Sequence, residues 1–246
     1  IRRQRQMCIR DREFYTEGLK RLTVELDSLL IPHHYADEVL TAELGSFDEG
    51  RIRIGRMAYS LVVIPQLVNL SSQILAMLEK FTQAGGVVLV VRNRLEPEKL
   101  TVDGEPASQQ VRDWFASLPA YDSEAAVAET VADLLPDRVR ITEHGVPARR
   151  VVGTFRDFDN LEGRGGRMHF IANLQYNQPC SLTIALPRTG RQVELIDPFS
   201  GKFSILSGVR HSGNHLVFDY PLAAGEAAVF FVSPHPETGS YTHLTL

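Results

Sequence analysis

The chain is poor in cysteine and tryptophan, and it has no excess of basic residues. Its 246 residues include two cysteines, Cys8 and Cys180, and one tryptophan. Two thiols are too few for a disulfide framework or a cysteine-based zinc site. Lys and Arg total 26 against 30 Asp and Glu, which gives a net charge of −4. No nucleic-acid partner is expected, because proteins that bind the phosphate backbone carry a basic excess or stripe.

Long apolar runs are also absent. No stretch of about 18 apolar residues occurs, so no membrane-spanning helix and no membrane partner are predicted. The start, Ile1-Arg2-Arg3, has neither a Met nor the apolar segment of a secretory signal, which predicts a piece of a longer protein. Ser240–Leu246 resembles translated sequencing-adapter read-through in a metagenomic fragment, so residues 237–246 are expected to be a disordered or artefactual tail.

The first half of the chain has the pattern of a βαβ unit. Tyr59–Ile64 is a largely apolar run, typical of a strand buried on both faces of a parallel sheet. Residues 74–81 carry an apolar stripe at helical spacing, with Asn69 or Ser71 as the N-cap. Val87–Val91 is a second apolar run. Strand, helix and strand in this order predict a right-handed parallel unit.

Other segments extend this α/β pattern. Apolar residues at three- and four-residue steps predict a helix over 13–30 and shorter helices over 111–115 and 125–135. Arg51–Ile54 alternates like a short edge strand.

From Val139 the apolar residues recur with period two. Met168, Phe170 and Ala172 alternate with Arg167, His169 and Ile171, and residues 182–186, 193–195 and 216–220 repeat the pattern. Short strands separated by Gly, Pro and Asn indicate an all-β antiparallel sandwich or a jelly-roll-like module. The change of period predicts an α/β domain over 1–138 and a β-sandwich over 139–236.

Motifs for a nucleophile or a nucleotide cofactor are missing. The two predicted parallel strands end in Pro65-Gln66 and in Arg92-Asn93-Arg94, which supply no Cys or Ser nucleophile, and this disfavours an amidotransferase-type enzyme. The turn after Ile64 has no glycine for a dinucleotide, and the glycines 163, 165 and 166 suit a hairpin. No cofactor is predicted, and Cys8 and Cys180 are expected to be inert.

One short segment concentrates polar side chains. Residues 33–38 read His-His-Tyr-Ala-Asp-Glu, a composition that suits the lining of a sugar site, a metal site or an ordinary capped loop. Adjacent histidines rarely point the same way and no matching ligand spacing follows, so the loop reading is favoured and no metal is predicted. His144 is no convincing partner, since it precedes Gly145 in a predicted turn.

Carboxylates and single aromatics in the rest of the chain leave alternatives open. A glycosidase needs two carboxyl groups about 5–10 Å apart, and the sequence does not show whether any pair among Asp157, Asp159, Glu162 and Asp197 meets that distance. Asp197-Pro198-Phe199-Ser200-Gly201 is also a good turn sequence, and Asn173 suits a turn or strand edge. Trp114 and Tyr176 suit either sugar stacking or packing.

The order of several segments resembles a known enzyme region. The segments are residues 48–55, 59–65 and 81–88. They resemble the flavodoxin-like, amidotransferase-like domain that follows the catalytic barrel in family 42 β-galactosidases and family 106 α-L-rhamnosidase-like enzymes. Met168–Asn173 and Leu195–Gly201 resemble two strands of the β-sandwich that follows there, with Ser200 where that pattern has Thr.

This resemblance implies an α/β three-layer, flavodoxin-like domain with a parallel sheet, followed by the sandwich. It implies a bacterial, polysaccharide-degrading parent, periplasmic or secreted, whose catalytic acids lie in a barrel absent from this chain. No catalytic residue carries over, and the expected partner is a carbohydrate substrate reached through that barrel. His33, His34, Tyr35 and Asp37 are the candidates for a substrate rim or an oligomer contact. The alternative is a stand-alone carbohydrate-binding or assembly module.

Overall fold

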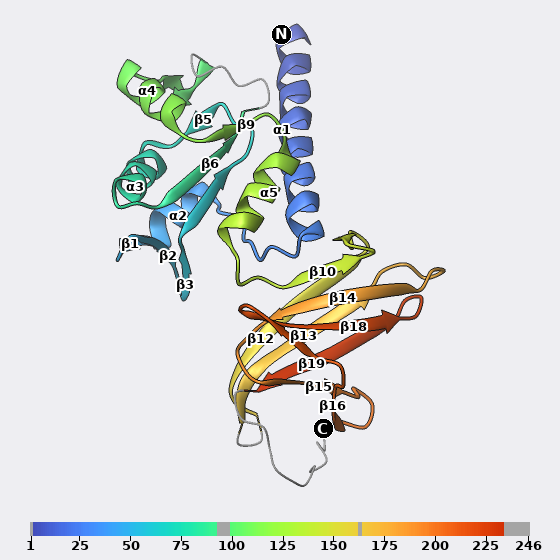
Figure 1. Cartoon of the computed structure of the whole chain (residues 1–246). Coiled ribbons are helices and arrows are strands. Elements are labelled where there is room, and N and C mark those ends of the chain that lie inside the picture. Colours follow the sequence, from blue (N-terminus) through green and yellow to red (C-terminus); the bar gives the residue numbers. More distant parts are fainter. Residues whose placement is uncertain (1, 93–98, 162–163, 234–246) are drawn as a thin grey trace. The chain divides into compact units, whose positions relative to one another are not determined.

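The computed structural model describes residues 2–92, 99–161 and 164–233. The chain divides into two compact units, each made of two stretches of sequence. The α/β unit comprises Ile1–Glu25 and His33–Thr130, and the sandwich unit comprises Leu26–Pro32 and Val131–Leu246. Figure 1 labels most of the elements of both units. Among the described residues, no helix combines the length and hydrophobicity needed to cross a membrane.

Helices α1 to α5 and strands β1 to β9 belong to the first part of the chain. The helices are α1 (Arg2–Ser28), α2 (Glu38–Leu44), α3 (Ser72–Gln83), α4 (Gln109–Ser117) and α5 (Glu124–Leu134). The strands are β1 (Gly45–Asp48), β2 (Arg51–Ile54), β3 (Met57–Tyr59), β4 (Leu61–Ile64), β5 (Asn69–Leu70), β6 (Val87–Val91), β7 (Thr101–Val102), β8 (Glu105–Pro106) and β9 (Ala120–Tyr121). Helix α1 begins earlier than the predicted residue 13, because residues 2–12 are mostly good helix formers although they lack an apolar stripe.

A three-stranded parallel sheet, in the order β4-β6-β9, lies at the centre of this unit. Helix α3 buries Ile74, Leu78 and Phe81 against it, while α5 lies on the other side of the sheet in Figure 1. The predicted parallel βαβ unit is therefore confirmed as β4, α3 and β6. The expectation that the first strand is buried on both faces was wrong, because β4 is an edge strand and only Ile64 is fully buried.

The ends of α3 show how the sequence sets its limits. Ser71 is the N-cap, and its hydroxyl accepts a hydrogen bond from the amide of Ile74 at 3.4 Å. Asn69, the other candidate, instead accepts from the amide of Gly104 at 2.8 Å. At the C-terminal end, a Cβ on Gly86 would lie 2.3 Å from the Phe81 ring, so only glycine allows the chain to turn this closely.

Two small sheets complete the α/β unit. Strands β1, β2 and β3 form one antiparallel sheet. The predicted strand Arg51–Ile54 is present as β2, but the expectation that it is an edge strand was wrong, because β1 and β3 pair with it on both sides. Strands β5, β7 and β8 form the other, with β5 and β7 parallel. The chain as a whole is thus β-rich, mostly antiparallel, with a few helices and some parallel strands.

The sandwich unit consists of two five-stranded sheets in which all neighbours are antiparallel. Its strands are β10 (Arg140–Glu143), β11 (Val146–Pro147), β12 (Val151–Leu161), β13 (Arg164–Asn173), β14 (Cys180–Pro187), β15 (Gln192–Ile196), β16 (Phe203–Ile205), β17 (Arg210–Ser212), β18 (His215–Leu222) and β19 (Ala227–Ser233). The sheets run β11-β10-β14-β18-β17 and β12-β13-β19-β15-β16. One core joins them, since Ile184 and Phe218 from the first sheet cluster with Ile171 and Phe230 from the second.

The face of β13 that packs in the core is not the face that carries the larger apolar residues of this strand. Ile171 is 1% exposed and lies in the shared core, and His169, on the same face of the strand, is also buried. Phe170 is 42% exposed on the other face. Gly166 fits the close approach of β19, because a Cβ there would lie 2.7 Å from the carbonyl oxygen of Val232. The β12–β13 pairing confirms the predicted hairpin, although Gly163 lies outside the described residues.

Candidate functional site

The four residues predicted for a substrate rim follow α1 and each makes local contacts. The Tyr35 hydroxyl lies 2.7 Å from the Thr23 hydroxyl, and the ring of His33 meets the Tyr35 ring edge-on at 5.8 Å. His34 makes a similar contact with Tyr59. Asp37 is the N-cap of α2, where its carboxylate accepts from the Leu40 amide at 2.9 Å.

The structure therefore gives Asp37 a capping role, in keeping with the capped-loop reading of this segment. His34 and Tyr35 are exposed, and His33 is half-buried. The two histidine rings contact different tyrosines and do not converge on one point. Among the described residues, no group of three or more His, Cys, Asp or Glu side chains is arranged to hold a metal ion.

At the carboxyl end of β4 lies a polar cluster that sequence reasoning missed. The Glu124 carboxylate accepts hydrogen bonds from Nε of Arg21 at 3.0 Å and from Nε2 of Gln66 at 3.4 Å. Gln66 is 3% exposed, and a Cβ on Gly18 would lie 2.9 Å from its Oε1. The cluster joins α1, the end of β4 and the start of α5, so it holds α1 against the sheet. Because its members are far apart in the sequence, no local motif indicates it.

The sandwich unit contains a cavity of about 390 Å³. Its walls are formed by β12, β13, the segment 134–139 and, from the first stretch of this unit, Leu30 and Pro32. Leu30, Leu134 and Ile171 make much of the lining apolar. This volume lies within the range of about 300–1,000 Å³ that is typical of small-molecule sites.

An ion pair between neighbouring strands lies beside the cavity. Arg167 donates from Nε to Oδ1 of Asp157 at 2.6 Å and from its terminal nitrogen to Oδ2 at 3.0 Å. These hydrogen bonds hold the pKa of the Asp157 carboxyl below its ordinary value. The guanidinium also lies 4.4 Å from the centre of the Phe155 ring. Arg167 is thus oriented by one carboxylate and one aromatic ring.

His169 is the unusual member of the cavity lining. It is 1% exposed, and within the described part of the chain neither of its ring nitrogens has a hydrogen-bond partner. Burial, reinforced by the positive charge of Arg167, lowers the pKa of His169 from 6.5 to about 4. The imidazole is therefore neutral at neutral pH. A buried polar group without a partner is rare in folded proteins and calls for an explanation.

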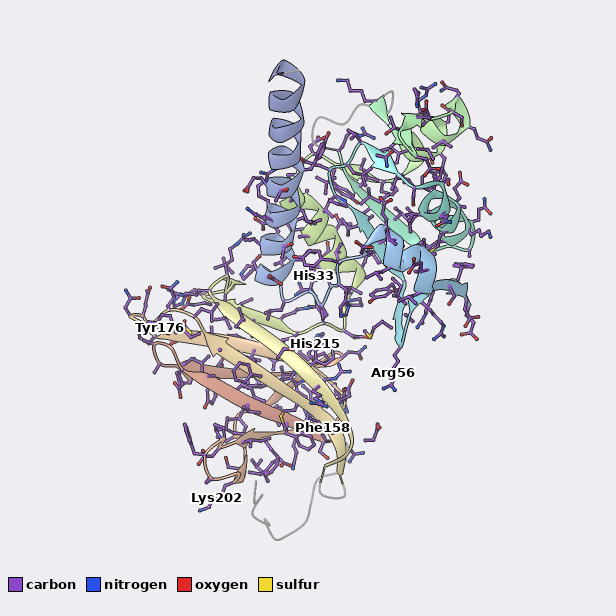
Figure 2. The ribbon with its side chains drawn as sticks, turned by 180° about the vertical axis from the view of Figure 1, so that it is seen from behind. His33, Arg56, Phe158, Tyr176, Lys202 and His215 are labelled. Atoms are coloured by element: carbon purple, nitrogen blue, oxygen red, sulfur yellow. The ribbon has the colours of Figure 1, made fainter. Side chains whose placement is uncertain are left out.

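The other buried histidine of this unit has a partner. His215, labelled in Figure 2, is 7% exposed, and its Nε2 lies 3.0 Å from the carbonyl oxygen of Arg138, to which it donates. The sequence did not distinguish the two histidines, since both occupy strand positions beside apolar residues.

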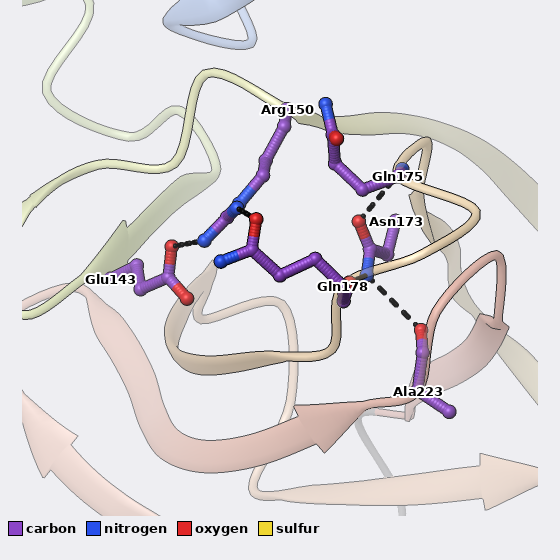
Figure 3. Close-up of polar contacts among 6 residues, drawn as sticks. All are labelled: Glu143, Arg150, Asn173, Gln175, Gln178 and Ala223. Atoms are coloured by element: carbon purple, nitrogen blue, oxygen red, sulfur yellow. Dashed lines mark hydrogen bonds and ion pairs between the residues drawn. The ribbon is translucent and has the colours of Figure 1, made fainter.

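Asn173, at the end of β13, organises the loops around it, as Figure 3 shows. Its Nδ2 donates to the carbonyl oxygens of Gln178 at 2.8 Å and Ala223 at 3.1 Å, and its Oδ1 accepts from the amide of Gln175 at 3.0 Å. Asn173 is 2% exposed, so it is a buried structural group, and the predicted turn or edge position understated its role.

Arg150 connects this loop to the other sheet of the sandwich (Figure 3). It donates to Oε1 of Gln178 at 2.7 Å and to the Glu143 carboxylate at 2.6 Å. The hydrogen bond from Arg150 holds the pKa of Glu143 below its ordinary value. Hydrogen bonds thus link the side chains of Glu143, Arg150 and Gln178, and Asn173 binds the backbone of the same loop, which indicates a structural network.

The remaining candidate residues take structural or exposed positions. Asp197 holds its turn by accepting from the Phe199 amide at 2.9 Å and the Ser200 hydroxyl at 2.5 Å, as the turn sequence predicts. Asp159 is exposed, and Glu162 lies outside the described residues. Tyr176 is 89% exposed (Figure 2).

Cys180 was expected to be inert, and Trp114 was open between sugar stacking and packing; the structure gives both residues packed positions. Cys180 is buried and its pKa is raised by burial, which favours the unreactive thiol form. The side chain of Cys8 lies outside the described residues. Trp114 packs against the core of the α/β unit, and its indole N–H donates to the Thr82 hydroxyl at 3.4 Å.

Comparisons with known proteins bear on the fold. No protein-family model and no curated protein matches the sequence. The structure of a rhamnosidase from Novosphingobium sp. PP1Y superposes with a TM-score of 0.59 at 18% identity, over 89% of this chain and 21% of that chain. The apo exo-carrageenase GH42 from Bacteroides ovatus superposes with a TM-score of 0.53 at 10% identity, over 88% of this chain and 26% of that chain.

The fold is glycoside hydrolase-like. At identities of 18% and 10% the likeness concerns the fold alone. Because 89% of this chain is covered, the glycoside hydrolase-like fold extends over both units. The resemblance inferred from the order of the segments is confirmed for the fold alone. This chain spans 21% and 26% of the two solved chains.

Proposed function

We propose that this chain is a non-catalytic accessory region of a polysaccharide-degrading, α-L-rhamnosidase-like glycoside hydrolase, which supports a barrel domain outside this sequence. The observation that carries the proposal is the asymmetry of coverage. Nearly all of this chain superposes on the rhamnosidase, but it accounts for 21% of that enzyme. The similarity to the exo-carrageenase has the same asymmetry, at 88% and 26%. A piece that recurs inside two larger enzymes fits a supporting module.

The finer architecture belongs to the same proposal. Parallel strands β4, β6 and β9, with α3 packed on one face, support a flavodoxin-like, three-layer domain over residues 1–138. The two antiparallel sheets support a sandwich over 139–236. The predicted tail, 237–246, lies entirely outside the described residues. A bacterial, periplasmic or secreted parent, and an oligomer or rim contact through His33–Asp37, remain parts of the proposal.

Assays of the chain by itself and with the barrel test this proposal. We expect the isolated chain to release no para-nitrophenol above the buffer rate from para-nitrophenyl α-L-rhamnoside or β-D-galactoside. The reading frame upstream of Ile1 should encode a barrel with paired carboxylates, and that barrel should lose thermal stability when expressed without this chain. Sustained turnover by the isolated chain would contradict the proposal.

A stand-alone carbohydrate-binding module is the second candidate, favoured by the cavity in the sandwich unit and by the exposed Tyr176. A glycan array with the isolated chain separates the two. Binding to a defined glycan in the absence of any upstream barrel would favour this candidate, and uniform absence of binding would count against it.

A further inference from the structure

The cavity of the sandwich unit has one feature that its packing does not explain. His169 lines a space of about 390 Å³ and is 1% exposed, yet no described residue bonds to either ring nitrogen. Leaving a polar group buried without a hydrogen bond costs about 1–3 kcal/mol in proteins. The same unit provides a carbonyl acceptor for His215, so a protein partner for a buried imidazole is available in this fold.

The charges around the cavity favour an uncharged ligand. Arg167 would attract an anion, but both oxygens of Asp157 already accept its hydrogen bonds, at 2.6 and 3.0 Å. His169 is buried and neutral at neutral pH. Asp137 and Arg138 also line the cavity and carry opposite charges. The Arg138 guanidinium already donates to backbone carbonyl oxygens, among them that of Leu29 at 2.9 Å. The positive groups are therefore balanced by Asp137 and by Asp157 beside Arg167, and an anion would meet these carboxylates.

The hydrogen-bonding capacity of His169 favours a hydroxyl group. A neutral imidazole has one N–H donor and one nitrogen acceptor, and a hydroxyl also both donates and accepts. Leu30, Leu134 and Ile171 line other parts of the cavity and suit apolar ligand surface. A ring that carries hydroxyls on some edges and C–H groups on its faces combines both properties.

We propose that this cavity binds a neutral, hydroxyl-bearing molecule of monosaccharide size, with ligand hydroxyls bonded to the ring nitrogens of His169 and its apolar surface against Leu30 and Ile171. The cavity volume lies at the small end of the range for ligand sites, about 300–1,000 Å³. The inference does not rest on the proposed accessory function, since both a supporting module and a stand-alone module could carry such a site.

Titration of the full chain with four sugars, followed through the histidine ring nitrogens by two-dimensional ¹⁵N NMR, tests the site. The sugars form two matched pairs, D-galactose with D-fucose and L-mannose with L-rhamnose, and the members of each pair differ by one terminal hydroxyl. We expect saturable shifts of the His169 ring nitrogens with at least one pair, and tighter binding of its deoxy member because of the apolar wall. Acetate is the anionic comparison and is expected to cause no saturable shift.

Three variants locate the binding within the cavity. Gly153 lines it, and a Cβ there would lie 3.5 Å from Leu30, so Gly153→Val fits the strand while its methyl groups reduce the cavity. His169→Phe removes the two nitrogens. Each change is expected to weaken binding at least about tenfold, as the loss of one good hydrogen bond or its equivalent does. The control Phe170→Ala changes the opposite face of the same strand and should bind within about twofold of the parent.

Because His169→Phe removes the reporting ring, binding to that variant is read from saturation-transfer signals of the sugar, and far-UV circular dichroism checks that each variant is folded. The proposal is overturned if no sugar shifts the His169 nitrogens at about 100 mM, or if Gly153→Val binds as well as Phe170→Ala. A saturable response to acetate and to none of the sugars would also overturn it, because the ligand class would then be wrong. The para-nitrophenol assay is independent of these results, so failure here leaves the accessory proposal standing.

Discussion

Strand β13 places two buried polar side chains on one face, four residues apart, in opposite situations. Asn173, at one end, makes three hydrogen bonds to the backbone of neighbouring loops. His169, nearer the middle, has no hydrogen-bond partner among the described residues and borders a cavity. Ile171 lies between them in the shared core.

The difference shows what each end of the strand is built for. At Asn173 the protein supplies every partner, so this position adds stability and fixes the loops. At His169 the ring nitrogens have no hydrogen-bond partner among the described residues, which lowers stability unless a ligand in the cavity bonds to them. Equal burial therefore does not mean an equal role, and the hydrogen-bond partners distinguish the structural residue from the ligand-binding candidate.

The largest loss of stability is expected at Asn173, the end of β13 where the buried side chain has hydrogen-bond partners. Replacing Asn173 by Leu removes three hydrogen bonds and leaves their backbone partners without this side chain, which should lower the free energy of unfolding by roughly 3–4 kcal/mol. Urea denaturation followed by far-UV circular dichroism measures it. The control is Asn177→Ala, an exposed residue of the same loop, which should change the value by less than about 0.5 kcal/mol. If both variants lost similar free energy of unfolding, the hydrogen bonds of Asn173 would not be stabilising, and Asn173 would not differ from His169 in this respect.

The next largest effect is a pH dependence of the free energy of unfolding, which is expected from His169 and not from Asn173. The unfolded chain protonates His169 with a pKa near 6.5, but in the folded state the value is about 4. Between these pH values the unfolded state binds more protons, so the stability that depends on His169 falls as the pH is lowered. We expect the parent to lose roughly 2–3 kcal/mol relative to His169→Phe between about pH 7 and about pH 4.5.

Urea denaturation of both proteins at the two pH values measures this difference. Because other groups titrate in both proteins, only the change in the gap between them is attributed to His169. If the gap is the same at both pH values, His169 is not buried as a neutral ring, and the comparison with Asn173 fails.

The smallest effect is expected at the ion pair beside the cavity. Asp157→Asn removes the charge that Arg167 faces, but the Asp157 side chain is 60% exposed, so the loss should stay below about 1 kcal/mol. Raising NaCl from about 0.05 M to about 0.5 M should reduce the difference between parent and variant, since salt screens exposed charges. A large loss that does not respond to salt would indicate that this pair belongs with the buried network around Asn173.

The α/β unit was largely predictable because its signals are local. The apolar run Val87–Val91 and the helix that begins after one of two cap candidates, Asn69 or Ser71, each depend on a few adjacent residues, and the structure confirms both with Ser71 as the cap. Strand β9 was missed because it has only two residues, too few for a periodic pattern. The flavodoxin-like layering stays a proposal, because it depends on how several such pieces assemble and no local pattern specifies that.

The cavity was not predictable, because its parts meet only in the folded chain. Leu30 and Leu134 are separated by most of the α/β unit in sequence, and Gly153 lies in strand β12, where charged residues obscure the alternation. The period-two pattern of β13 was correct, but the larger residues Met168 and Phe170 favoured the wrong face. The inner face carries Ile171, whose partner on β12 is Gly153, and neither residue marks that face through a local pattern.

The division of the chain into interleaved stretches limits how it can be cut. The sandwich unit includes Leu26–Pro32, which precedes almost all of the α/β unit in sequence. Arg138 donates to the carbonyl oxygen of Leu29 at 2.9 Å, and Leu30 packs against the sandwich core. No single proteolytic nick can therefore release an intact sandwich. A sequence that is to form the whole sandwich unit must therefore include the end of α1 as well as residues 131 onward.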